Sequence, residues 1–195
     1  CNCVRPHLYH IIQGAYYDPL NNRPTGRYSY ERIATIADHR HGTFVRGGNF
    51  RPAPLVPTAG QRAEESRAGG GHAHCGAMVY LGDNWPSKYR NQIFMNNVHG
   101  RRINNDRLTR KGSGYTASHE PDVMIAADPW FVGVSLVYGP DGAVYSSDFS
   151  DTGECHHHIN TQKHTGRIFK IAYGKPKTWQ GDLNKLSDEE LLKLN

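Results

Sequence analysis

Two histidines spaced two residues apart lie in a glycine-rich stretch, AGGGHAHCGAMVYLG, at residues 68–82. His72 and His74 would face the same side of an extended chain, because side chains alternate along a strand. Two imidazoles on one side can ligate a metal ion, or can orient a hydroxyl substrate and accept its proton near neutral pH. The glycines also permit a tight chain crossing in which both imidazoles bond to backbone carbonyls, and we favour this structural interpretation. The stretch does not fit a nucleotide loop, since no strand is expected before it and no helix after it.

A second group of potential ligands, SDFSDTGECHHH, follows a strand-like segment at residues 147–158. Its carboxylates could bind calcium, and its imidazoles could bind a transition metal. Asp148 and Asp151 join His72 and His74 as candidates for cofactor-binding or pocket residues. The candidate metal ligands of the chain are then His72, His74, Asp151, His156 and His158. A loop rich in such residues is more often simply solvated, and that is the interpretation we favour.

The remaining residues with chemical potential are weaker candidates. The four cysteines, Cys1, Cys3, Cys75 and Cys155, follow neither the two-pair spacing of a zinc site nor the C-x-x-C-H spacing of a haem attachment. The pair in DHRHG, residues 38–42, and His99 are both typical of turns. Trp85 and Trp130 each adjoin a proline and are expected to anchor packing, with stacking on a sugar as the alternative.

Composition narrows the fold and function classes. Only 37% of the residues are hydrophobic, while glycine (21), proline (11) and tyrosine (11) are plentiful, which favours short strands and many turns. No apolar run approaches the roughly 20 residues of a membrane helix, so we expect no membrane span. The net charge is +5, but the basic residues are scattered. A solvated face accounts for them, and we expect no nucleic-acid partner.

Alternating apolar residues and turn signals predict a series of short strands. One strand pair or bent strand is expected over 7–18, a short helix or turn over 28–42, and a long loop over 43–71. Regular strands then follow in GAMVYLGDNWP, on both sides of the turn at residues 98–100, and in GSGYTASHEPDVMI, frayed by Pro121. Two more strands flank the turn at 139–142, and GRIFKIAYG closes the set. Ser187 and Glu190 form a capping box that predicts a helix start.

The spacing of these strands is that of propeller blades. The sequence therefore predicts an all-β fragment of a β-propeller, with about two and a half four-stranded antiparallel blades, a long loop insertion and a short C-terminal helix. We divide it into a partial propeller over 1–174, with a blade remnant at 1–42, the loop at 43–71 and blades at 72–174, and a linker with the start of a helical region at 175–195. Because the chain starts at Cys1 without a signal-like segment, we expect it to be a piece of something longer.

Five segments occur in an order that resembles a known family: GGGHAHCGAMVYLG, NNVHGRRINNDRL, KGSGYTASHEPD, ADPWFVGVSLVYGPDGAVYSSDFSDTGECH and GRIFKIAYG. Together they resemble the later blades of the glucose/sorbosone dehydrogenase-like β-propellers, and within these the planctomycete-type "membrane-bound dehydrogenase" propellers. The likeness extends over about residues 5–174. It implies a ring of about six blades, completed by the remaining blades of the parent chain and followed by helical and cytochrome domains.

The resemblance also implies a periplasmic or exported enzyme that oxidises a sugar or polyol. Electrons would pass through pyrroloquinoline quinone or another quinone to a haem c on another domain, and calcium is a further candidate ion. The better understood members carry arginine just before the GPDG turn, where it holds the quinone carboxylates, but VGVSLVY at that place has no basic residue. Their catalytic histidine lies in an early blade, outside this chain, so no catalytic residue is transferred. The alternative is a propeller binding or scaffold module without the quinone site.

Overall fold

The computed structural model describes residues 8–17, 33, 36, 74–98, 100–128, 130–150, 164–175 and 181–193. Its strands are β1 (His74–Val79), β2 (Ile93–Asn97), β3 (Arg102–Lys111), β4 (Gly114–Ile125), β5 (Gly133–Tyr138), β6 (Val144–Asp148) and β7 (Arg167–Ile171). The helical elements are the short 3-10 turns η2 (Ser87–Tyr89) and η3 (Leu183–Lys185), and helix α2 (Asp188–Lys193). No helix among the described residues is long and apolar enough to cross a membrane.

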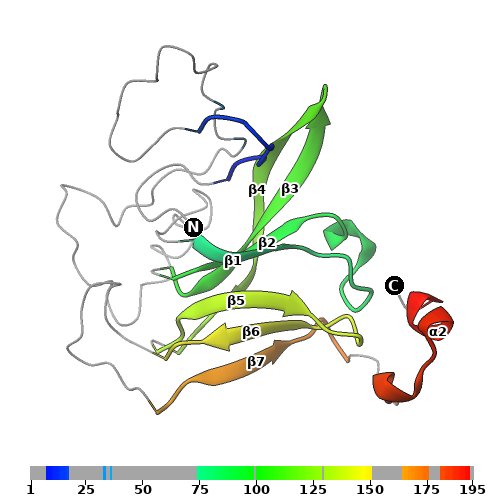
Figure 1. The fold of residues 1–195 in the computed structure, drawn as a ribbon. Helices are drawn as coiled ribbons and strands as arrows, with labels where there is room; N and C mark the ends of the chain where they lie inside the picture. The colour runs from blue at the N-terminus through cyan, green and yellow to red at the C-terminus, as the bar shows by residue number, and fades with distance from the viewer. Residues whose placement is uncertain are drawn as a thin grey trace.

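The first sheet has the strand order β1-β2-β3-β4, and every pair is antiparallel (Figure 1). The turn predicted at residues 98–100 joins β2 to β3, as expected. β4 continues through Pro121, because β4 is an edge strand and the β3–β4 register shifts between the Ile103 and Asn105 pairs. The predicted fraying at this proline is therefore a local irregularity within a continuous strand.

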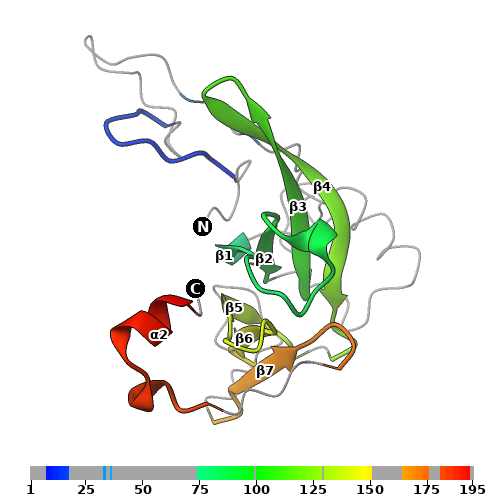
Figure 2. The same ribbon diagram turned by 90° about the vertical axis from the view of Figure 1, so that its right-hand side faces the viewer.

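The second sheet has the order β5-β6-β7, and it lies beside the first sheet through their first strands. Figure 2 shows the two sheets diverging from β1 and β5. The thiol of Cys75 donates to the carbonyl of Gly133 at 3.4 Å across this contact. Two adjacent antiparallel sheets that do not close into a ring are the architecture of a partial propeller, so the predicted fold class is confirmed. Within the residues that the structure describes, the second sheet has three strands, where four were expected.

A hydrophobic core fills the space between the two sheets. Its buried members are Tyr80, Trp85, Phe94, Ile103, Leu136 and Val144. The Tyr80 hydroxyl donates to the carbonyl of Gly142 at 2.7 Å and accepts from the backbone N–H of Trp85, so it ties the loop after β1 to the β5–β6 turn. Burial raises the pKa of this hydroxyl. The prediction that Trp85 is a packing residue is confirmed, since its side chain is 8% exposed.

Ile168 of β7 does not belong to this core. Ile168 is 77% exposed, because the alternation along β7 turns Phe169 and Ile171 toward the first sheet instead. Ile171 packs against the core cluster. Ile168 therefore belongs to the outer face of the second sheet.

The sequence prediction is wrong for the N-terminal part of the described chain and correct for its C-terminal helix. Residues 8–17 form no strand; they form a turn, and Tyr17 makes one parallel bridge with Ile33. The predicted loop at 43–71 and most of 28–42 lie outside the described residues. Helix α2 follows the predicted capping box, with the Ser187 hydroxyl donating to Glu190 at 3.0 Å. No α2 residue is buried, and the hydrogen bonds from Ser187 lower the pKa of Glu190.

Candidate functional site

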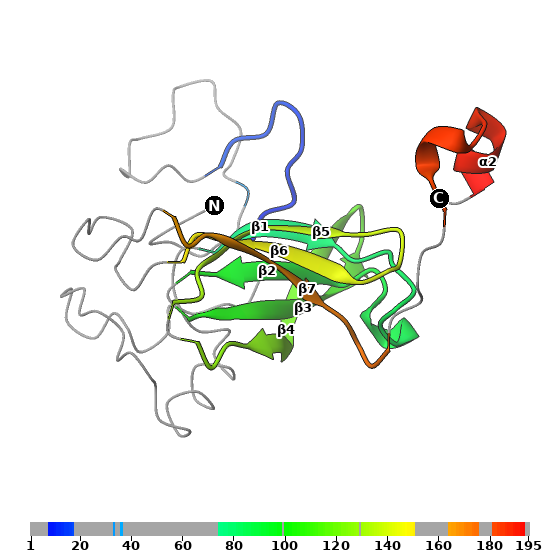
Figure 3. The ribbon, with the colours of Figure 1, turned by 90° about the horizontal axis from the view of Figure 1, so that it is seen from below.

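One side of the two sheets contains the starts of β1, β3, β5 and β7 and the ends of β2, β4 and β6. We call this side the polar end. In the first sheet the register places His74, Asn97 and Arg102 in one row, and in the second sheet Gly133, Asp148 and Arg167 form the corresponding row. The polar end lies to the left in Figures 1 and 3. Two separate hydrogen-bonded clusters of polar side chains occur there.

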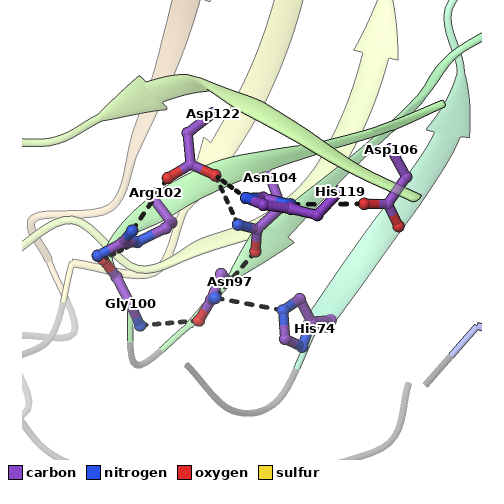
Figure 4. Close-up of polar contacts among 8 residues, drawn as sticks. All are labelled: His74, Asn97, Gly100, Arg102, Asn104, Asp106, His119 and Asp122. Atoms are coloured by element: carbon purple, nitrogen blue, oxygen red, sulfur yellow. Dashed lines mark hydrogen bonds and ion pairs between the residues drawn. The ribbon is translucent and has the colours of Figure 1, made fainter. Parts of the chain in front are cut away.

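The first cluster is built around a buried ion pair. Arg102 on β3 donates from Nη1 to Oδ2 of Asp122 on β4 at 2.9 Å, and the two side chains are 0% and 2% exposed. The second carboxylate oxygen of Asp122 accepts from Nδ2 of Asn104 at 2.7 Å. Arg102 also donates from Nε to the carbonyl of Gly100, within the β2–β3 turn. This pair therefore joins two strands and a turn (Figure 4).

His74 is oriented by the same network. The backbone N–H of Gly100 donates to Oδ1 of Asn97 at 2.8 Å, which fixes the orientation of the Asn97 amide group. The Nδ2 of Asn97 then faces Nε2 of His74 at 3.2 Å and also donates to Asn104. A nitrogen that faces an amide N–H must accept, so the ring is in the tautomer with its proton on Nδ1. The lone pair that a base or a metal ligand needs is thus already engaged at Nε2.

A second imidazole extends this cluster along β4. The Nδ1 of His119 lies 3.6 Å from Oδ1 of Asp106, and its Nε2 lies 3.7 Å from Oδ1 of Asp122. His119 is therefore held between two buried carboxylates, as Figure 4 shows. A carboxylate on each side of an imidazole can fix the orientation of its ring.

The second cluster belongs to the second sheet. Both oxygens of Asp148 are engaged: Oδ1 accepts the backbone N–H groups of Val132 and Ser150, and Oδ2 accepts from Arg167. Arg167 also pairs with Asp128 at 2.6 Å. The backbone N–H of Trp130 and the Arg167 guanidinium together hold the pKa of Asp128 below its usual value. Burial lowers the pKa of the neighbouring Arg101, although the charge of Asp128 opposes this.

The two predicted residues that the structure describes lie at the same end but not in one pocket. Asn96 faces the second sheet and accepts from Ser146, so its neighbour Asn97, and with it His74, lies on the opposite face of the first sheet. Asp148 lies on the face of β6 that contains Ser146, toward the first sheet. His72, Asp151, His156 and His158 lie outside the described residues. Within the described ranges, no group of three or more potential ligands could hold a metal ion.

Most of the cluster residues were not singled out from the sequence. Asn97, Arg102, Asn104 and Asp122 lie inside segments predicted as ordinary strands. A signal was present in NNVHGRRINND, where polar residues occupy alternate positions that a sheet core would normally fill with apolar ones. His99, expected to do no chemistry in this turn, lies outside the described residues.

A quinone that carries carboxylates would need arginine side chains at the polar end to bind them. Each arginine described at the polar end already has an acidic neighbour: Arg102 pairs with Asp122, Arg167 with Asp148 and Asp128, and Arg101 lies near Asp128. Binding the quinone carboxylates would require breaking these pairs. Asp148 likewise has no uncommitted oxygen for calcium. The residues described at this end therefore do not fit either group.

The charge pairs predict how stability depends on pH. The pKa of Asp128 is lowered as described above, and that of Asp141 is lowered because Lys170, the Ala143 N–H and the Tyr145 hydroxyl outweigh the effect of burial. Carboxyls with lowered folded pKa values stabilise the fold above the unfolded value of about 3.9 and lose that contribution as pH falls through the folded values. We expect the urea midpoint to decrease between about pH 5 and pH 2.

Replacement of Arg167 by methionine tests the source of this slope. We expect Arg167→Met to lower stability by about 1–3 kcal/mol at pH 7 and to flatten the acid slope. The pair with Asp128 is more than one-third exposed, whereas the other carboxylate partner, Asp148, is buried. Lys185→Met removes the cation of an exposed pair with Asp182 and serves as the control. An acid slope that Arg167→Met leaves unchanged would contradict a contribution of Arg167 to the lowered pKa of Asp128.

Comparison with known proteins gives one match. A family model described as "Domain of unknown function (DUF7133)" matches residues 19–175. No curated protein and no solved structure shows significant similarity to the chain. The matched region contains all seven strands and both polar clusters.

Proposed function

This chain belongs to the DUF7133 family, whose function is unknown, and we propose that it is the C-terminal part of the propeller of an exported dehydrogenase that oxidises a sugar or polyol. In this proposal its blades form part of the wall of the substrate channel. The redox group, a quinone or a haem, and the residues that carry out proton transfer belong to other parts of the parent protein. The remaining blades and the helical and cytochrome domains of that parent are its partners.

The observation that carries the proposal is the common end of the two sheets. Polar side chains gather there, close to the point where the first strands β1 and β5 lie side by side. In a closed ring, the first strands of the blades border the central channel, and their ends form its mouth. Asparagine, aspartate, arginine and histidine can all bond to substrate hydroxyls, and a hydrogen-bonded network holds such groups in fixed positions.

Oxidation of an alcohol needs a base for the hydroxyl proton and an acceptor for the hydride. His74 does not supply the base in this proposal, because its Nε2 lone pair faces the Asn97 amide at 3.2 Å. Asp148 does not supply it either, because both of its oxygens accept hydrogen bonds. The contribution of this chain is therefore the positioning of polar groups at the channel mouth.

A specific observation favours the second candidate, a propeller binding or scaffold module without a quinone site. Arg102 and Arg167 are paired with carboxylates of the same chain, and Arg101 lies near Asp128. A protein that no longer binds an anionic cofactor would show such pairing at this end. The two candidates differ in whether the complete parent protein transfers electrons from a polyol.

The experiment is an assay of the complete parent protein with a dye as the electron acceptor. Aldoses and alditols are tested with and without added pyrroloquinoline quinone and calcium. The dehydrogenase proposal expects reduction of the dye that depends on the polyol. Binding of polyols by calorimetry without dye reduction would support the binding module instead.

A matched variant tests the role given to His74. His74→Gln keeps an acceptor for Asn97, so we expect kcat to stay within about threefold of the wild-type value, as for a residue outside the chemistry. A loss of about 100-fold in kcat, with an unchanged unfolding midpoint, would instead place His74 among the proton-transfer residues.

A further inference from the structure

The second sheet has an outer edge at which a fourth strand would lie. Its strand order is β5-β6-β7, and among the described residues no strand pairs with the side of β7 that faces away from β6. Figure 1 shows β7 as the lower edge of this sheet. In the first sheet the corresponding place is taken by β4, which pairs with β3. The second sheet therefore has room for one more strand beside β7.

The other three edge strands of the two sheets contain extra residues. At one point β1 uses residues 75–78 where β2 uses only residues 94–96, so one extra residue lies on β1. β5 likewise holds one extra residue within 133–136. β4 holds two within 120–124, a range that includes Pro121. Extra residues and prolines bend an edge strand and hinder the pairing of another strand with it.

Strand β7 has neither of these protective features. Its five residues, Arg167–Ile171, pair with the five residues of β6 without a register shift, and none of them is proline. Ile168 is 77% exposed on the outer face of this strand. A regular, partly apolar edge strand is a template to which a further strand can add through backbone hydrogen bonds. Among the four edges, the edge of β7 is thus the one suited to strand addition.

The described chain after β7 is helical or irregular and supplies no such strand. Residues 172–175 form bends, and residues 181–193 contain η3 and α2. Figures 1 and 3 show α2 beyond the ends of the strands, away from the outer edge of β7. A change from strands to helical structure after β7 is the pattern of a last blade, because another blade would begin with another strand.

We propose that the second sheet is the last blade of the propeller, and that a strand from the N-terminal part of the parent protein pairs with β7 as its fourth strand. This closure rests on the proposed function, in which the chain is the C-terminal part of the ring. The last blade of a ring has two neighbours, the blade before it, here the first sheet, and the first blade. The chain that enters the first blade therefore passes beside the edge of β7, and its pairing there closes the ring.

The two faces of β7 define the chemistry of the added strand. Phe169 and Ile171 are partly buried and turn toward the first sheet, so apolar neighbours fit beside them. Ile168 favours an apolar neighbour on the opposite face. Lys170 is already paired with Asp141 and does not require an acidic neighbour. The added strand is therefore an extended segment with apolar side chains on both faces, rather than a charged segment.

Hydrogen exchange tests the pairing through the backbone amides of β7. In an antiparallel pair, alternate N–H groups of an edge strand point away from the partner strand, so they exchange rapidly unless another strand accepts their hydrogen bonds. We expect the slowest of these outward amides, within residues 167–171, to exchange at least about tenfold more slowly in the complete parent protein than in the 195-residue chain. The hairpin over residues 107–118, where β3 and β4 extend beyond β2 (Figure 2), is the control and should exchange equally in both.

A photoreactive benzophenone side chain at the position of Ile168 identifies the source of the added strand in the parent protein. Cross-linked peptides from its N-terminal part would support the proposal. Cross-links to residues 1–195 of the same chain, cross-links between two copies, or equal exchange of β7 in the two proteins would overturn it. Polyol-dependent dye reduction by a parent protein with a rapidly exchanging β7 would refute the closure alone. A protected β7 without dye reduction would refute the dehydrogenase alone.

Discussion

Replacing Arg102 with methionine will lower the free energy of unfolding by about 3–5 kcal/mol. The Arg102 and Asp122 side chains are 0% and 2% exposed, so the substitution leaves a carboxylate buried with its cation removed. It also removes the bond from Arg102 Nε to the Gly100 carbonyl in the β2–β3 turn. Denaturation in guanidinium chloride, followed by circular dichroism, measures the change.

The same strand offers a matched control for this prediction. Arg107 pairs with Glu120 at 3.0 Å, but its side chain is 59% exposed, so Arg107→Met should cost less than about 1 kcal/mol. The double variant Arg102→Met, Asp122→Leu removes both charges and should be more stable than Arg102→Met alone. Equal losses of unfolding free energy in Arg102→Met and Arg107→Met would show that the buried ion pair stabilises the fold no more than the exposed pair does.

The sequence predicted the strands well because their signals are local. Apolar alternation and turn residues placed seven strand segments between residues 76 and 174, and the seven strands β1 to β7 lie between His74 and Ile171. The capping box of Ser187 and Glu190 likewise predicted α2, since a cap depends on two residues three apart. Where the prediction was wrong, at residues 8–17, tyrosine and isoleucine suggested a strand, but the Tyr17 hydroxyl bonds to the backbone and closes a turn.

The candidate site was harder to predict because it depends on pairing between strands. Nothing in the spacing of Arg102 and Asp122, 20 residues apart, shows that the β3–β4 register and its irregularity bring them together. Asp148 shows the same limit. The sequence suggested that its carboxylate could bind a ligand, but in the structure Arg167 and two backbone N–H groups engage both of its oxygens. The contact between the two sheets also joins residues far apart in the sequence, because Gly76 on β1 lies against Val134 and Ser135 on β5.

Replacing Gly76 with alanine will lower the free energy of unfolding by about 2–5 kcal/mol. Gly76 has φ +60°, at the point where the β1–β2 register shifts, and this conformation alone costs an alanine about 1–2 kcal/mol. An added Cβ would also lie against the Val134 carbonyl and 2.8 Å from Cα of Ser135, which are backbone atoms of β5 that cannot rotate away. The clash would force the two sheets apart or shift β5, a further cost of about 1–3 kcal/mol.

The variant Gly112→Ala separates the cost of the positive φ from the cost of the clash with β5. It has φ +59° in the β3–β4 turn, with nothing within 4 Å of an added Cβ. Gly112→Ala should therefore show only the conformational cost of about 1–2 kcal/mol. The excess loss in Gly76→Ala, measured by the same denaturation experiment, reports the packing of β1 against β5. Equal losses in the two variants would mean that the first strands of the two sheets are not in contact in solution, and the partial-propeller arrangement would then be wrong.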